Sequence, residues 1–231
     1  MKKIILGVFS VFLLFSFISC DFFVTSLGSG MQRDLNAALK KESAGDLAKL
    51  AKDPQFQDPS SGVAVLNALS GKSEADIQAL SVSEQESIMD LALAVSVPTS
   101  ALNDLADIAQ NDDPEALFNS ILESINSFDT TVLQAILNDE DAQESASAES
   151  LISASVALVA QVMKREGSDL EFEDLQDLID GGNISGSSIT EESKADLQAV
   201  QAIFDLFITG DRKDEAIDFF GLSLEDLFGG N

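Results

Sequence analysis

Signals that start and stop helices recur at short intervals, and they constrain the fold more than any other feature of the sequence. Ser stands three residues before a carboxylate at several places, which is the spacing of an N-terminal helix cap. Asp58-Pro59 and Asp113-Pro114 have the order of a cap followed by a first-turn proline. Glycines follow several apolar runs, where helices end. The caps are Ser73 with Asp76, Ser83 with Glu86, Ser168 with Glu171 and Ser223 with Asp226; the prolines are Pro59 and Pro114; the glycines are Gly71, Gly167, Gly181, Gly210 and Gly221.

Apolar residues between these signals follow the helical period. Ile88, Leu91 and Val95 fall on one helical face. A second face, near the C-terminus, holds Leu197, Val200, Phe204, Phe207 and Ile208. No alternating run is long enough for a convincing sheet. The sequence therefore predicts an all-α fold of about ten short helices, arranged as a solenoid-like tandem repeat or as an irregular helical bundle.

An internal similarity favours the tandem arrangement. The segment 46–51 recurs at 104–109, and apolar positions then agree at an offset of 56, as Val65-Leu66 does with Ile121-Leu122. A later helix begins Glu86-Ser87 in the first copy and Glu149-Ser150 in the second. Chance recurrence of such pairs in an acidic helical chain is the alternative. We predict two stacked copies over residues 43–167, without assigning them to a named repeat family.

Charge excludes one class of partner. The chain has 40 acidic and 13 basic residues, a net charge of −27, and residues 73–163 hold 17 acidic residues and no basic one. Such a charge repels phosphate backbones, so nucleic-acid binding is not expected. Within 73–163 no internal ion pair can form, so these carboxylates should lie on solvated faces. Solubility is the simplest explanation, with a basic partner or a divalent cation as alternatives.

Missing residue types argue against catalysis. The chain has no His, Trp or Tyr and one Cys. An imidazole base, a Ser-His or Cys-His pair and a cysteine-rich metal cluster are therefore excluded. Calcium is the one metal that oxygen ligands alone could hold, and 138–141 and 111–113 offer clustered oxygens. Neither matches the EF-hand loop, so linkers and helix caps are the better interpretation. We predict a non-enzymatic protein without cofactor or resident metal.

The N-terminal segment has the layout of an export signal. Lys2 and Lys3 precede a mostly apolar run over 4–18, which ends at Ser19-Cys20 before Asp21. The run of about 15 residues is shorter than the ~20 that a spanning helix needs. A signal cut near Ser19 to release a soluble protein and a membrane-spanning signal anchor are the alternatives to the interpretation that follows.

Phe17-Ile18-Ser19-Cys20 resembles the lipobox of bacterial lipoproteins, with Phe17 where Leu is commonest. Relaxed lipoboxes of this kind are similar to those of spirochaetes. The resemblance implies that Cys20, the only cysteine, is acylated and becomes the first residue of the mature chain. Two or more acyl chains hold a protein stably on a membrane, whereas a single acyl chain gives only marginal attachment. The resemblance therefore implies a lipid anchor on the periplasmic or cell-surface side of the envelope.

These signals predict four segments: a signal peptide at 1–19, a lipidated tether with a first helix at 20–42, the repeat region at 43–167 and a C-terminal helical part at 168–231. A Gly- and Ser-rich stretch at 181–188 should be a flexible connection. The C-terminal part is rich in phenylalanine, which predicts either core or an apolar ligand or partner face. Its phenylalanines are Phe204, Phe207, Phe219, Phe220 and Phe228.

The function expected from these features is that of a lipid-anchored, extracytoplasmic binding or scaffolding module whose partner is a protein. The alternative is a carrier of small apolar molecules, with a pocket lined by the C-terminal phenylalanines.

Overall fold

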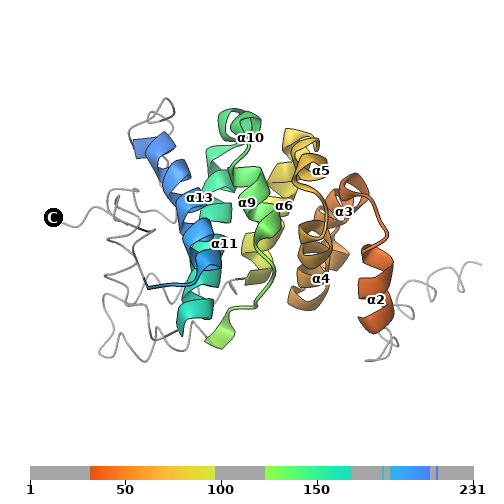
Figure 1. Ribbon diagram of the computed structural model, residues 1–231. Coiled ribbons are helices and arrows are strands. Elements are labelled where there is room, and N and C mark those ends of the chain that lie inside the picture. Colours follow the sequence, from red (N-terminus) through yellow and green to blue (C-terminus); the bar gives the residue numbers. More distant parts are fainter. Residues whose placement is uncertain (1–31, 97–122, 168–183, 185–187, 209–211, 213–231) are drawn as a thin grey trace, which may run out of the picture. The chain divides into compact units, whose positions relative to one another are not determined.

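The computed structural model describes residues 32–96, 123–167, 184, 188–208 and 212 (Figure 1). These residues form nine α-helices and one 3-10 helix, and none of them lies in a strand. The predicted all-α fold is therefore confirmed. The longest helices, of 19 and 18 residues, exceed the short lengths expected.

Two compact units divide the chain, Met1–Lys41 and Glu42–Asn231, and each is described by itself. Within the described residues, the first unit holds α2 (Gln32–Leu39). The second unit holds α3 (Ala44–Ala51), η1 (Pro54–Phe56), α4 (Pro59–Ser70), α5 (Glu74–Gln78), α6 (Val82–Ser96), α9 (Thr131–Leu137), α10 (Glu140–Ser145), α11 (Ala148–Glu166) and α13 (Glu191–Ile208).

Several predicted helix ends are confirmed. The Ser73 hydroxyl accepts the Asp76 N–H at 3.2 Å and caps α5. Asp58 caps α4 through the N–H groups of Ser60 and Ser61, and Pro59 is the first helical residue. Gly71 and Gly167 follow the ends of α4 and α11. The remaining predicted signals lie outside the described residues: Ser168 with Glu171, Ser223 with Asp226, Pro114, Gly181, Gly210 and Gly221.

The predicted start of α6 is wrong by two residues. The helix begins at Val82, and Ser81 rather than Ser83 pairs with an acid three residues on. Glu84 accepts both the Ser81 N–H, at 3.0 Å, and the Ser81 hydroxyl, at 2.7 Å. Two Ser-x-x-Glu spacings overlap here, and the earlier one satisfies a backbone donor that would otherwise lack a helical partner. Ser83 instead accepts the Lys52 ammonium at 2.8 Å.

Helix α6 lies at the centre of the second unit. It packs against α3 and α4 on one side and against α11 on the other, and α11 in turn packs against α13 (Figure 1). Its predicted apolar face of Ile88, Leu91 and Val95 is at most 1% exposed. Because Met89 and Ala92 are also buried, α6 is covered around most of its circumference.

Helices that the predicted duplication makes equivalent lie side by side. Helix α5 packs against α9, and α6 packs against α11. The pairing is reinforced by α6 carboxylates, because Glu86 accepts the Ser147 N–H at 2.8 Å and Asp90 accepts the Ser150 hydroxyl at 2.9 Å. Residues 97–122, which include segment 104–109, lie outside the described residues, so the two-copy repeat stays a prediction.

Candidate functional site

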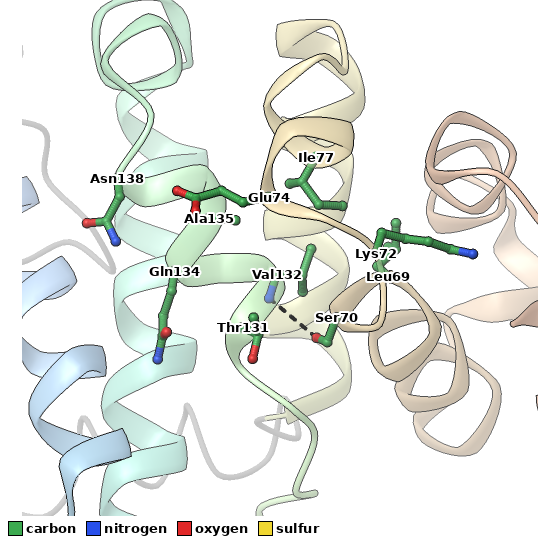
Figure 2. Close-up of a pocket in the computed structure, with 10 residues that line it drawn as sticks. All are labelled: Leu69, Ser70, Lys72, Glu74, Ile77, Thr131, Val132, Gln134, Ala135 and Asn138. Carbon is green, nitrogen blue, oxygen red and sulfur yellow. Dashed lines mark hydrogen bonds between the residues drawn. The ribbon is translucent and has the colours of Figure 1, made fainter.

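A pocket of about 130 Å³ opens between the α4–α5 turn and α9 (Figure 2). Its apolar part is formed by Leu69, Ile77 and Val132, each at most 1% exposed. Polar and charged groups surround this apolar part. The full lining is Leu69, Ser70, Lys72, Glu74, Ile77, Thr131, Val132, Gln134, Ala135 and Asn138.

Hydrogen bonds across the seam hold the two walls of the pocket together. The Ser70 hydroxyl donates to the Asp129 carbonyl at 2.6 Å and accepts the Val132 N–H at 3.3 Å (Figure 2). The Asn67 side-chain oxygen accepts the Asp129 N–H at 2.8 Å. Since both functions of the Ser70 hydroxyl are in use, this group fastens α9 to α4 and is not set up as a nucleophile.

One residue that lines the pocket is hydrogen-bonded to a member of a buried ion pair. Gln134 donates through Nε2 to Oδ1 of Asp196 at 2.7 Å. The other oxygen of Asp196 accepts Nη1 of Arg165 at 3.0 Å, and the Asp196 side chain is 0% exposed. The network therefore joins α9, α11 and α13 behind the pocket wall.

The same network fixes the start of α13. Arg165 donates to Ser193 at 2.8 Å and to Glu192 at 2.9 Å. Glu166 accepts the Thr190 N–H at 3.1 Å and the Ser193 hydroxyl. Side chains from the last turn of α11 therefore bind both acceptors and donors at the start of α13.

Burial and hydrogen bonding shift carboxyl pKa values in opposite directions. Burial raises the pKa of Asp196 despite hydrogen bonds from Gln134 and Arg165. Partial burial also raises the pKa of Asp90, and the nearby carboxylates of Glu149 and Glu86 add to that effect. The Ser81 hydroxyl and N–H lower the pKa of Glu84.

These shifts predict that stability first rises and then falls as the pH is lowered. A carboxyl whose pKa is raised in the native state destabilises that state at neutral pH. This penalty disappears as the pH falls through the raised native pKa toward the pKa of the unfolded chain, which is 3.8 for Asp90 and Asp196. The stabilising contribution of Glu84 is lost at still lower pH, as the pH falls through its lowered pKa. Urea denaturation between about pH 7 and pH 3 should therefore give a maximum on the acidic side of neutrality.

The variant Asp196→Asn provides the control for this profile. It removes the titrating group with the raised pKa while keeping an oxygen that can accept from Gln134. The acid-side gain in stability should be smaller in the variant. An identical profile in both proteins would mean that the gain arises from other carboxylates.

The predicted phenylalanine face is described only in part. Phe204 and Phe207 are 5% and 2% exposed on α13, and the guanidinium of Arg212 lies 5.2 Å from the centre of the Phe207 ring. Neither residue lines the pocket in Figure 2. Phe219, Phe220 and Phe228 lie outside the described residues, as do Phe17, Ile18, Ser19 and Cys20.

The oxygen cluster at 138–141 serves as a helix cap. Asp139 accepts the Asp141 N–H at 3.2 Å and the Gln85 side chain at 3.2 Å. Residues 111–113 lie outside the described part. Among the described residues, no group of three or more Asp, Glu, His or Cys side chains is placed to hold a metal ion.

The pocket and the ion pair were not predicted from the sequence. A signal for Asp196 was nevertheless present, because this residue lies on the same helical face as Val200, Ile203 and Phe207, all of which are buried. The pocket had no such signal, since its lining joins α4 and α5 to α9, which is distant from both in sequence.

Comparison of the chain with protein-family models, with curated proteins and with solved structures finds no match. No helix in the described ranges is long and apolar enough to cross a bilayer.

Proposed function

We propose that the protein is a lipid-anchored, non-enzymatic binding module on the extracytoplasmic side of a bacterial envelope. The observation that carries the binding role is the pocket between the α4–α5 turn and α9. Its lining combines apolar side chains with hydroxyl, amide and charged groups, and the Ser70 hydroxyl is already engaged in two hydrogen bonds. This composition suits recognition of a side chain better than chemistry on a substrate.

Pocket size favours a macromolecular partner. Pockets for drug-sized ligands usually enclose about 300–1,000 Å³. The cavity here, about 130 Å³, is the size of a single side chain and is open to solvent. A partner protein could therefore place one residue in it while contacting the surrounding helices.

The alternative function, carriage of an apolar ligand by the C-terminal phenylalanines, has less support. Phe204 and Phe207 are buried by helix packing rather than arranged around the pocket. We therefore place the binding surface at the α4–α9 seam and assign these two phenylalanines to the core.

Stacked copies would give such a module an extended surface. The side-by-side packing of α5 with α9 and of α6 with α11 supports a tandem duplication, because it brings predicted equivalents together. We infer that the seam containing the pocket lies where the two copies meet.

Lipid attachment is tested by metabolic labelling with an alkyne fatty acid. The wild-type protein should incorporate the label and partition with the membrane fraction, whereas Cys20→Ala should lose both properties, because Cys20 is the only thiol in the chain. Ser16→Ala, a change within the apolar run, is the matched control and should still be labelled. Label retained by Cys20→Ala would refute the anchor.

The binding role is tested separately by crosslinking in the native cell. The wild-type protein should give a discrete crosslinked protein species. Absence of any such species, with the protein correctly localised, would argue against a binding module.

A further inference from the structure

The buried face of α13 is apolar along most of its length. Leu197, Val200, Ile203, Phe204 and Phe207 are at most 5% exposed, where α13 packs against α11 and α9 (Figure 1). If α13 moved along its axis by one turn, about four residues, Phe204 would stand where Val200 now lies, and Phe207 where Ile203 lies. Apolar contact has no direction, so it would be kept in more than one register.

Several directional contacts lie at the start of α13. Nη1 of Arg165 donates to Oδ2 of Asp196 at 3.0 Å and to the Ser193 hydroxyl at 2.8 Å. Oε1 of Glu166 accepts the Thr190 hydroxyl at 2.6 Å and also the Ser193 hydroxyl. We call these five residues the α11–α13 junction. Because a hydrogen bond needs its two heavy atoms about 3 Å apart, these contacts exist only in the observed register.

A displacement of one turn would break the junction at a buried position. Val200 would replace Asp196 beside the Arg165 guanidinium, and the Gln134 amide would lose the same acceptor. Asp196, which is 0% exposed, would leave the cation that neutralises it. Separating a buried charge from its partner is strongly unfavourable. The junction therefore discriminates between registers that apolar contact alone separates only by the sizes of the side chains.

A buried ion pair is a weak source of stability, because the cost of removing two charges from water offsets most of the attraction between them. The best-attested use of buried polar groups is to fix the register of packed helices. We propose that the α11–α13 junction selects the register in which α13 packs against α11 and α9. This role does not depend on what the pocket binds, although Gln134, which donates to Asp196, also lines that pocket.

A triple variant, Arg165→Met with Glu166→Ala and Asp196→Val, tests the proposal. It removes the acid and the base together, so no buried charge is left unpaired. The variant should fold with the helix content of the wild type, as measured by circular dichroism. In the wild type, the methyl NMR signals of Leu197 and Val200 should each form one set. In the triple variant they should split into two or more sets or broaden, because α13 occupies several registers.

Asp46→Val with Lys49→Met is the matched control, because it removes an acid and a base that pair at 2.8 Å on an exposed face of α3. The α13 signals of this control should stay single. A single sharp set in the triple variant, with the wild-type nuclear Overhauser contacts between α13 and α11, would overturn the proposal. Failure of the triple variant to fold would also overturn it, because the junction would then serve stability rather than register.

Spin labels measure the displacement directly. Ala94→Cys and Ala202→Cys place labels at exposed positions of α6 and α13, in a Cys20→Ala background that removes the native thiol. With the junction intact, one distance is expected. The triple variant should add a second population that differs by up to about 6 Å, since four helical residues rise by about 1.5 Å each. One unchanged distance would overturn the proposal, and neither readout depends on binding at the pocket.

Discussion

Replacing Arg165 with Met should lower the free energy of unfolding at neutral pH by about 3–5 kcal/mol, the cost of leaving a buried charge without its partner. Asp196 is 0% exposed, and its contact with Nη1 of Arg165 at 3.0 Å supplies the neutralising charge. Gln134 would remain as a donor to one carboxylate oxygen, but it carries no charge. Equilibrium urea denaturation followed by circular dichroism measures the loss.

Two further variants separate the buried charge from the packing of the Arg165 side chain. Asp196→Asn combined with Arg165→Met removes both charges and should recover a large part of the lost stability. Lys49→Met breaks an exposed pair with Asp46, whose side chains are 69% and 53% exposed, and should leave the urea midpoint unchanged. An Arg165→Met protein as stable as the wild type would mean that Asp196 does not depend on this cation.

Gly62→Ala should destabilise the protein by about 1–3 kcal/mol, although alanine is the better helix former. Gly62 lies on α4 where that helix packs against α6. A Cβ atom added there would overlap Cγ1 of Val95 and lie 2.7 Å from the Phe56 carbonyl oxygen. The second neighbour is backbone, so it cannot move aside by changing a rotamer, and the helices would have to separate.

The control for this substitution is Gly45→Ala, which we expect to stabilise the protein. Gly45 is also helical, but an added Cβ atom would meet nothing within 4 Å. The free energy of unfolding should rise by about 0.5–1 kcal/mol, which is the ordinary difference between glycine and alanine in a helix. Thermal melts of both variants suffice, and a stabilised Gly62→Ala would show that α4 and α6 are not closely packed at this point.

Local features of the fold were predictable from the sequence because they depend on neighbouring residues. Ser73 and Asp58 cap helices as their spacing indicated, and Gly167 ends α11. The start of α6 shows the limit of such rules, since two overlapping spacings were available and the two hydrogen bonds that Ser81 donates to Glu84 decided between them.

The candidate site was not predictable in the same way. Its walls come from segments about 60 residues apart, joined by bonds such as that between Ser70 and Val132. Composition did indicate where the carboxylates of the acidic stretch would lie, and Glu74, Asp76 and Glu140 are indeed exposed. That Glu74 lines the pocket depended on the packing of α5 against α9, and no local pattern determines that contact.

Helix α6 supplies acceptors for its neighbour as well as apolar contacts. Glu86 and Asp90 accept the Ser147 N–H and the Ser150 hydroxyl at the start of α11, so these two hydrogen bonds exist only while α6 is folded beside α11. Fraying of either helix would break both hydrogen bonds. The two helices are therefore coupled into one cooperative unit, and two acidic side chains of α6 link the opening of one helix to that of the next.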